Sequence, residues 1–409
     1  MKLKKFFAGV LAAAMMLTVG ATAAFATAPA TGETDNNAVT YTPSETNVDL
    51  GIMKNYKVEK GTAPKEEFTF NVSYVSENSK PYTSTYNYTG TKSAKFEENM
   101  AAKEDAYQAS LGIKIQDFNL PAGPGKYCFE IKENVPTKKT PGVTYDETTR
   151  YLVITVANNS DLNGYVYYAQ LYDNNYTPAN SIKDKATGTK VDGAKAFTNT
   201  YTANNVVISK DIKGGLGDLA AKFTFKVKLT AADGKTANQY VGAKVVHSDD
   251  ADVTANTVWA VSEKNSAEDA GWYEVKLGRN EQIELENLPE DIVVTVKETD
   301  GGEYTVEQNP SDITSKNANT SYTKIGTMNN SGVVTATVGT ANGSIGFINT
   351  KEGTPDMGVV LDNAPYIAML AIVAIGGVAL MLNKRRRDEE ELLAVDYTPP
   401  SSLAGCHRP

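Results

Sequence analysis

The chain has 409 residues, 41% of them hydrophobic and 9% aromatic, which is enough apolar material for the cores of two or three domains. The formal net charge is -9, and no basic patch with interleaved aromatics precedes the C-terminal tail, which argues against a nucleic-acid binder. The two cysteines lie on opposite sides of an apolar C-terminal stretch, which argues against a disulfide between them. The chain has two histidines, which favour neither a zinc cluster nor a Ser-His-Asp triad. We expect no metal and no cofactor.

Residues 1–26 have the form of a secretory signal peptide. Three lysines precede an apolar run over residues 6–19, and small residues then lead to a cleavage point after Ala26. The apolar run is too short for a membrane anchor. We therefore expect the following chain to be exported, with residues 27–44 as a flexible leader.

The first expected strand carries a lysine on its apolar face. The residues of this face alternate along the chain and are Val48, Leu50, Ile52, Lys54, Tyr56 and Val58. Further strands are expected at 68–72, 127–133, 151–156 and 166–171, with a short surface helix inserted within 92–111 because that stretch is rich in Ala, Glu and Lys. Glu133 continues the apolar face of its strand, and Asn199 lies on the apolar face of a closing strand that begins at Phe197.

The second half repeats this order, and the junction lies in the stretch 195–214, where one strand is expected to end and the next to begin. Lys210 alternates with Val206, Ile208 and Ile212; Glu298 continues a face of Ile292, Val294 and Val296; Asn349 continues a face of Ile345 and Phe347. FTFKV at 223–227 echoes FTFNV at 68–72. The repeat predicts an all-β fold of two tandem immunoglobulin-like β-sandwich domains, residues 45–202 and 203–352.

Each half thus places a Lys, a Glu and an Asn, in that order, on faces that are otherwise apolar. A lone Lys or Asn at a strand end is usually solvated, but the same three coincidences in both halves require a common cause. Burial lowers the pKa of a lysine and raises that of a glutamate, so the two can coexist as a neutral amine and a neutral acid. A neutral amine is a nucleophile, and the acid can polarise an Asn carbonyl and carry protons to departing ammonia. The expected product is a Lys–Asn isopeptide bond.

These residues resemble the streptococcal major (backbone) pilins with two intramolecular isopeptide domains of the CnaB-like class. Lys54-Asn55 matches the KN dipeptide of that family, Glu133 and Glu298 match its VxE-like strand, and FTN at Asn199 and FIN at Asn349 match its FxN strand. The resemblance covers about residues 45 to 387. It implies one bond from Lys54 to Asn199 promoted by Glu133, and another from Lys210 to Asn349 promoted by Glu298.

The C-terminal region resembles the sortase signal of Gram-positive pilins. The pentapeptide position reads Thr354, Pro355, Asp356, Met357 and Gly358, with Thr354 where Leu is expected and Met357 where Thr is expected. A 19-residue apolar stretch, 364–382, and a basic cluster complete a signal spanning 353–387, which predicts a transmembrane segment before processing. The alternative is a tether that is never cleaved. No role is assigned to the cytoplasmic tail, 388–409.

The resemblance also implies a lysine that attacks the acyl-enzyme of the next subunit, and Lys190 is the candidate, with Lys195 as the nearby alternative. The expected function is therefore a structural pilus subunit at the surface or cell wall of a Gram-positive bacterium, not an enzyme beyond its single-turnover cross-linking. Expected partners are a sortase, other copies of the chain, a tip or minor pilin, and cell-wall peptidoglycan. The alternative is a monomeric anchored adhesin; no carboxylate pair marks a wall hydrolase.

Overall fold

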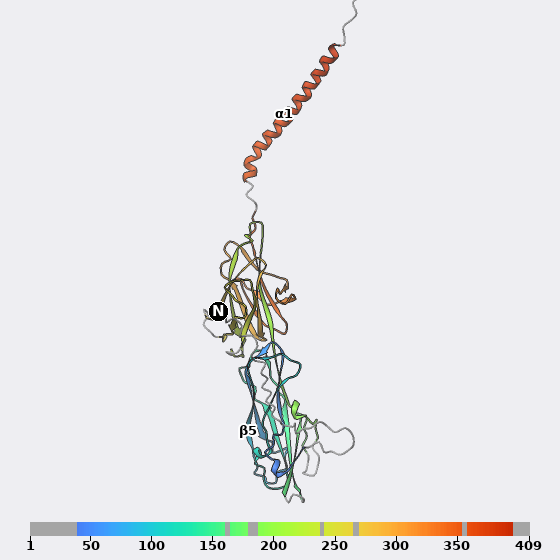
Figure 1. The fold of residues 1–409 in the computed structure, drawn as a ribbon, viewed down its shortest axis with the longest axis vertical. Coiled ribbons are helices and arrows are strands. Elements are labelled where there is room, and N and C mark those ends of the chain that lie inside the picture. The colour runs from blue at the N-terminus through green and yellow to red at the C-terminus, as the bar shows by residue number, and fades with distance from the viewer. Residues whose placement is uncertain are drawn as a thin grey trace, which may run out of the picture. The chain divides into compact units, whose positions relative to one another are not determined.

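A computed structural model gives the fold and describes residues 39–159, 164–178, 187–237, 241–264, 270–353 and 358–395. The chain divides into two compact units (Figure 1). One contains the described residues up to Lys213 together with Gly217–Thr350. The other contains Gly214–Leu216 and the residues from Lys351 onward. Short 3-10 helices in the first unit are η1 (Pro43–Glu45), η2 (Ile115–Phe118) and η3 (Gly193–Lys195).

The first half of the larger unit contains a six-stranded antiparallel sheet in the order β1-β11-β10-β8-β4-β5. The strands are β1 (Val39–Tyr41), β4 (Glu66–Tyr74), β5 (Thr89–Phe96), β8 (Gly125–Glu133), β10 (Thr149–Asn159) and β11 (Gly164–Tyr172). A separate ribbon pairs β3 (Thr62–Ala63) with β6 (Met100–Ala101).

An eleven-stranded sheet runs through both halves in the order β15-β14-β17-β12-β24-β21-β20, with β2, β7, β9 and β19 paired off this path. Its strands are β2 (Met53–Lys60), β7 (Tyr107–Ser110), β9 (Val143–Thr144), β12 (Phe197–Lys213), β14 (Gly242–Ser248), β15 (Val258–Ala260), β17 (Glu281–Pro289), β19 (Thr305–Gln308), β20 (Ile313–Thr314), β21 (Ser321–Lys324) and β24 (Gly343–Thr350). A five-stranded sheet faces its second half and contains β16 (Trp272–Gly278), β13 (Lys222–Ala231), β18 (Ile292–Glu298), β23 (Val333–Thr337) and β22 (Thr327–Met328).

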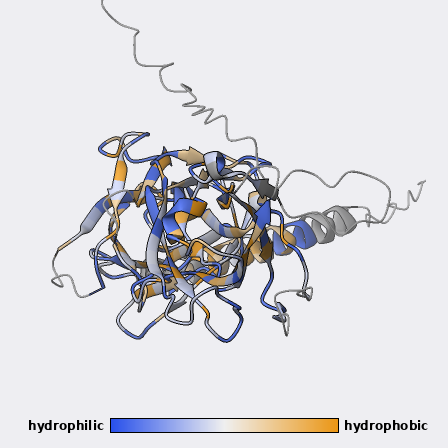
Figure 2. Cartoon of the chain, turned by 90° about the horizontal axis from the view of Figure 1, so that it is seen from below, coloured by the Kyte–Doolittle hydropathy of each residue, from blue (hydrophilic) through white to orange (hydrophobic). Residues whose placement is uncertain are grey.

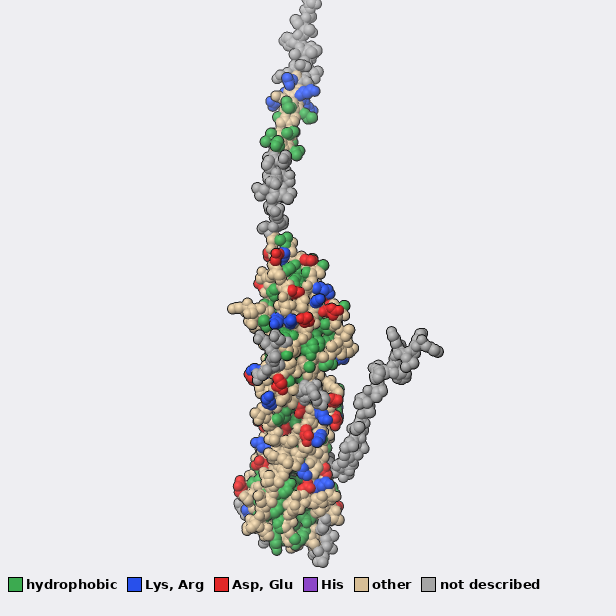
Figure 3. Space-filling view, turned by 90° about the vertical axis from the view of Figure 1, so that its left-hand side faces the viewer, with side chains coloured by type: hydrophobic (Ala, Val, Ile, Leu, Met, Phe, Trp, Pro, Cys, Tyr) green, Lys and Arg blue, Asp and Glu red, His purple; other side chains and the backbone are tan. Residues whose placement is uncertain are grey.

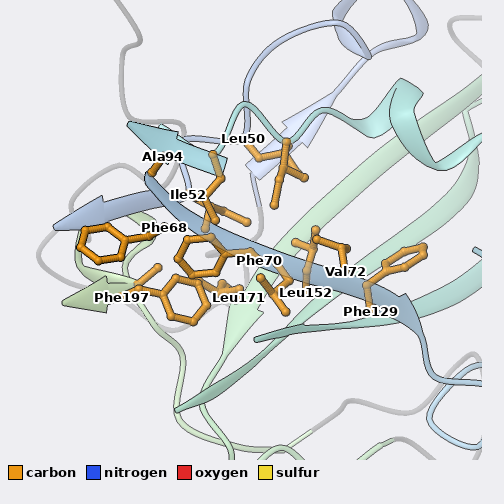
Figure 4. Packing of buried hydrophobic residues seen from close by; sticks show 14 of the residues in the cluster. Leu50, Ile52, Phe68, Phe70, Val72, Ala94, Phe129, Leu152, Leu171 and Phe197 are labelled. Carbon is orange, nitrogen blue, oxygen red and sulfur yellow. The ribbon is translucent and has the colours of Figure 1, made fainter. Parts of the chain in front are cut away.

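Alternating side chains of these strands form two hydrophobic cores. In β4, Phe68, Phe70 and Val72 are at most 2% exposed, while the residues between them point to the other face. Figure 4 shows such side chains from several strands converging in the first core, and many peripheral loops in Figure 2 are hydrophilic. The first core extends in sequence from Tyr41 to Ala203 and the second from Val206 to Phe347. The prediction of an all-β, sandwich-type fold is confirmed.

The stretch 195–214 holds one continuous strand, not the end of one strand and the start of another. β12 pairs in parallel with β2 through Phe197–Thr202 and with β24 through Val206–Lys213. Between these two segments, the ladder of β12 with β17 has a register irregularity, between Asn204 and Val206. The strand continues because its backbone finds ladder partners on both sides of that point, which the alternation of its side chains does not reveal.

The prediction of a short helix within residues 92–111 is wrong. These residues contribute to β5, β6 and β7 instead, and β5 pairs with β4 along its whole length. Ala94 and Phe96 of β5 are 1% and 4% exposed and pack into the first core. Burial and strand pairing outweigh the helix propensity of the Ala, Glu and Lys residues here.

Two smaller expectations also differ from the structure. Val48 is 44% exposed, because Gly51 has a φ of +70° and the regular strand begins only at Met53. Cys128 alternates with the inward-facing residues of β8 and would be expected to face outward, yet it is fully buried, because Val153, Tyr172 and Tyr176 cover that outer face. An outer strand face can therefore be buried by residues distant in sequence.

The smaller unit contains the helix α1 (Gly358–Val395), which includes the apolar stretch 364–382. In the part of the chain that the structure describes, no helix is long and apolar enough to cross a membrane, so the span expected there is not confirmed. The signal peptide at 1–26, most of the leader and residues 354–357 of the expected sorting motif lie outside the described residues.

Candidate functional site

The six residues singled out by their position on apolar faces come together as two clusters of three. In the first, Lys54 Nζ lies 2.6 Å from Glu133 Oε2 and 2.5 Å from Asn199 Oδ1, and Asn199 Nδ2 lies 2.7 Å from Glu133 Oε1. The side chains of Lys54 and Glu133 are 0% and 1% exposed, and Asn199 is fully buried. The glutamate thus contacts the amine with one oxygen and the amide with the other.

The second cluster repeats the two contacts that the glutamate makes. Lys210 Nζ lies 2.7 Å from Glu298 Oε2, and Asn349 Nδ2 lies 2.5 Å from Glu298 Oε1. The lysine and glutamate side chains are 0% and 2% exposed, and Asn349 is fully buried. The two clusters differ at the amide oxygen, because Asn349 Oδ1 has no hydrogen-bond partner among the described residues.

Strand register places these residues identically in the two halves. In the parallel pair of each half, the lysine lies opposite the Phe of the FxN strand: Lys54 opposite Phe197, and Lys210 opposite Phe347. The asparagine lies two residues further on, on the same face. The glutamates come from the opposite sheets, where Glu133 pairs with Phe70 and Glu298 with Phe225. Each cluster therefore joins the two layers of its sandwich.

Aromatic rings enclose the lysine amines. Lys54 Nζ lies 5.1 Å from the ring centroid of Phe68 and 5.6 Å from that of Phe70, both labelled in Figure 4. Lys210 Nζ lies 4.3 Å from the ring centroid of Phe223 and 5.5 Å from that of Phe225. The FTF repeat in the sequence predicted these strands, but it did not indicate that their rings would line the sites.

Burial shifts the pKa values of both lysines and of Glu133 toward their neutral forms. Desolvation lowers the pKa of Lys54 despite the nearby Glu133, and it lowers the pKa of Lys210 to about 8. Desolvation likewise raises the pKa of Glu133, against the opposing effect of Lys54. Charged forms lose hydration in a low-dielectric interior, so an uncharged amine beside an uncharged acid becomes accessible. This is the state in which a lysine is nucleophilic.

The other expected site residues lie apart from the clusters. Lys190 is exposed and forms an isolated bridge with Tyr172, and Lys195 is exposed at the end of η3. Within the described ranges, no group of three or more His, Cys, Asp or Glu residues is placed to hold a metal ion. On the face seen in Figure 3, basic and acidic side chains are interspersed over the larger unit, whereas basic side chains gather on α1, which contains the run Lys384–Arg387.

Asp146 is a residue near the first cluster that the sequence did not indicate. Its backbone N–H donates to Asn199 Oδ1 at 2.6 Å, and its carboxylate accepts from the backbone of Thr198 at 2.7 Å. It follows the two-residue strand β9 and has no distinguishing sequence pattern. Only the approach of this turn to β12 identifies it.

Comparisons with known families cover both halves of the larger unit. Residues 50–202 match the family described as Spy0128-like isopeptide containing domain (FctA). Residues 204–351 match a family described as a domain of unknown function, DUF7601. A search of curated proteins gives no match.

Among solved structures, the chain is similar to the major pilin from Streptococcus pyogenes, with 19% identity, a TM-score of 0.45, and coverage of 74% of this chain and 98% of that one. It is similar to the T3.2 major pilin of Streptococcus pyogenes serotype GAS13637, with 15% identity, a TM-score of 0.40 and coverage of 74% and 97%. It is also similar to the pilus-presented adhesin Spy0125 (Cpa), with 18% identity, a TM-score of 0.27 and coverage of 50% and 37%.

Proposed function

We propose that the chain is a structural subunit of a cell-surface pilus, cross-linked by its own lysines and asparagines, since residues 50–202 match the family described as Spy0128-like isopeptide containing domain. The observation that carries the proposal is the pair of buried clusters in which a glutamate contacts a lysine amine with one oxygen and an asparagine amide with the other. The proposed bonds are Lys54–Asn199 and Lys210–Asn349.

The positions of the two glutamate oxygens suit a proton relay. The lone pair of Lys54 Nζ attacks Asn199 Cγ, and the amine passes a proton to Glu133 Oε2. The protonated Glu133 Oε1 delivers a proton to Asn199 Nδ2, the Cγ–Nδ2 bond breaks, and ammonia leaves. One amide bond replaces another and the glutamate ends as it began. Glu298 serves Lys210 and Asn349 in the same way, and each site acts once.

Both bonds involve β12, so they give the chain a short covalent route for tension. Force that enters through β2 passes from Lys54 to Asn199, along β12 to Lys210, and across to Asn349 in β24. The 145-residue separation between the first two partners is thereby bypassed. A cross-link closing a loop of this size contributes roughly 5 kcal/mol by the chain-entropy estimate. Such a route suits a fibre under load.

Assembly by sortase is the second part of the proposal. The signal at 353–387, with Thr354–Gly358 as the recognition pentapeptide, would be processed at the membrane after export, and Lys190 or Lys195 of the next copy would receive the acyl group. Exposure of both lysines supports this role. The partners are then a sortase, further copies of the chain, a tip or minor pilin, and peptidoglycan at the cell wall.

Intact mass tests the cross-links directly. The region 27–353, made recombinantly, should weigh roughly 34 Da less than its sequence because two ammonia molecules are lost. Glu133→Ala should restore one ammonia while leaving the second bond intact, and an unshifted mass in the unaltered chain rules out the proposed bonds.

Polymerisation is tested separately in the native host. Wall extracts should show a ladder of covalent multimers that Lys190→Ala or Lys195→Ala abolishes. A single species in the unaltered strain supports the monomeric anchored adhesin instead, while ladders that persist in both variants and in the double variant remove these lysines from the proposal.

A further inference from the structure

The amide oxygens of the two asparagines have different surroundings. Asn199 Oδ1 receives the backbone N–H of Asp146 at 2.6 Å in addition to the amine of Lys54 at 2.5 Å. Asn349 Oδ1 is buried with no hydrogen-bond partner in the described part of the chain. The two clusters, alike in their contacts through the glutamate, therefore differ at the atom on which negative charge develops when an amine attacks the amide carbon.

Strand connections explain this difference. In the first half, β9 pairs with β12 at Thr200 and Tyr201 and then ends, so the following turn brings Asp146 over Asn199. In the second half, β19 pairs with β24 directly across Asn349, through Val306, and continues to Gln308. A continuing strand directs its N–H groups into the ladder, whereas a turn leaves an N–H free to point at a side chain.

The side chain of Asp146 fixes this turn to the strand that carries the asparagine. Its Oδ2 accepts from the backbone N–H of Thr198 at 2.7 Å, and its Oδ1 accepts from the backbone N–H of Thr148 at 2.9 Å. One carboxylate thus connects the residue next to Asn199 with the far side of its own turn. The Asp146 N–H is held in place by bonds that its own side chain makes.

We propose that Asp146 is a positioning residue for the first cross-link, and that its backbone N–H stabilises the oxyanion formed on Asn199 as Lys54 attacks. In this step the Nζ–Cγ bond forms and the carbonyl electron pair moves to Oδ1, where the N–H already lies. The pair returns to the carbonyl when the Cγ–Nδ2 bond breaks and ammonia leaves with the proton from Glu133. The inference rests on the proposed cross-linking and assigns the first site a device that the second lacks.

The charge of Asp146 has the opposite expected effect, which makes the two roles separable. Its carboxylate raises the pKa of Lys54, against the larger lowering by desolvation, and so favours the protonated, unreactive amine. It also raises the pKa of Glu133, which favours the neutral acid that the relay uses. If the main contribution of Asp146 were the effect of its charge on the amine, removing that charge would accelerate the first bond. If placement of the N–H is its contribution, loss of the side chain slows that bond, because the turn is released.

The test is a time course of both bonds in the same full-length chain. The chain is made by cell-free translation, portions are quenched in acidic denaturant, and the two cross-linked peptide pairs are quantified by mass spectrometry. We expect Asp146→Ala to slow the Lys54–Asn199 bond by about 10-fold or more, since losing one oxyanion donor costs 100- to 1,000-fold in enzymes. The Lys210–Asn349 bond should remain within about twofold and serves as the internal control.

Two further variants separate the explanations. Glu147→Ala removes the neighbouring acid of the same turn, which is exposed and pairs with Lys139, and should leave both rates unchanged. Asp146→Asn removes the charge but keeps an acceptor oxygen, and it should retain the first bond at a rate above that of Asp146→Ala. Limited proteolysis of Asp146→Ala in a Glu133→Gln background, where no first bond forms, should show a folded first half.

The outcomes are distinct. An unchanged or faster first bond in Asp146→Ala overturns the proposal, as does equal slowing of both bonds. If Asp146→Ala does not fold, the decision falls to Asp146→Asn. The proposal is then overturned if the first bond forms in Asp146→Asn no more slowly than in Glu147→Ala at every pH from 5 to 8. Absence of both bonds from the unaltered chain is a failure of the proposed cross-linking itself.

Discussion

Single buried groups determine the chemistry that each half can perform. Lys54 and Lys210 would carry a heavy desolvation cost as isolated ammonium ions, and each instead contacts a glutamate inside a wall of phenylalanine rings. Desolvation makes the burial of these amines unfavourable for stability, and the same desolvation lowers the pKa of each amine. A residue that weakens the uncross-linked core is therefore the residue best suited to cross-link it.

Removing one ring should test the role of this wall. Phe223→Ala opens the surroundings of Lys210 Nζ, which lies 4.3 Å from the ring centroid, and so should raise the pKa of that amine toward its ordinary value. We expect the Lys210–Asn349 bond to form roughly 10-fold more slowly near neutral pH, because about one pKa unit changes the neutral fraction by that factor. Peptide mass spectrometry over time measures the rate of this bond, and the rate of the Lys54–Asn199 bond serves as the control. Equal rates of the Lys210–Asn349 bond in Phe223→Ala and in the unaltered chain would contradict this role of the ring.

Glu66, a partly buried acid outside the two clusters, gives the first half a predicted pH dependence. Burial raises the pKa of Glu66 to about 7, and its Oε1 has no hydrogen-bond partner among the residues described. Because the pKa of Glu66 is higher in the folded state than in the unfolded state, the contribution of this group to the free energy of unfolding is complete below about pH 4.5. That contribution is lost as the pH rises through 7.

Glu66→Gln should remove this dependence. We expect the free energy of unfolding of the unaltered chain to fall by up to roughly 3 kcal/mol more than that of the variant between pH 4.5 and 7.5. Denaturant titrations at several pH values measure the difference, and Glu67→Gln, an exposed neighbour on the same strand, is the control. Parallel pH profiles for the unaltered chain and Glu66→Gln would contradict the assignment.

At the scale of elements, β12 is the strand on which both sites depend. It carries Asn199 for the first cluster and Lys210 for the second, and it changes partner from β2 to β24 at the register irregularity. Several residues brace the strand at that point. Gly142 O accepts from Thr202 N at 3.0 Å, and Asn204 Nδ2 donates to Gly339 O at 2.6 Å. The junction is thus held by bonds from both halves.

Gly142 offers a test of this bracing. Its φ is +75°, and an added Cβ would lie 2.6 Å from Thr202 O and 3.0 Å from Pro289 Cβ. We expect Gly142→Ala to lower the free energy of unfolding by roughly 1–3 kcal/mol more than Gly112→Ala. Gly112 has a φ of +61° and open space around it, so it carries the backbone strain without the clash.

The measurement should use a chain with Glu133→Gln and Glu298→Gln, so that no cross-link conceals the change, and should follow urea unfolding. Equal effects of the two glycine substitutions would show that β12 is not tightly enclosed at the junction.

At the scale of the whole molecule, the proposed bonds separate mechanical from thermodynamic stability. With both bonds in place, pulling through the ends of the larger unit loads the segment of β12 between Asn199 and Lys210. The rest of each sandwich lies outside that route and stays folded. Without a bond, the corresponding sandwich can extend fully.

Single-molecule stretching should show this directly. The unaltered chain should give no unfolding step between residues 54 and 349, because the covalent route bypasses both loops. Glu133→Ala should add a step of roughly 50 nm, the extended length of the 145 residues released. Glu298→Ala should instead release the second half alone. Unfolding steps of that length in the unaltered chain would exclude the proposed route of force.

The sequence by itself determined the repeated order of Lys, Glu and Asn on inward-facing strand positions, because alternation is a local property that each strand displays in its own residues. Lys54, Lys210 and the two asparagines could be found in this way. Tertiary structure alone decided that β12 is continuous, that 92–111 forms strands, and that the turn at Asp146 meets Asn199. Those features depend on backbone pairing between distant segments, and pairing partners leave no periodic signal in either segment.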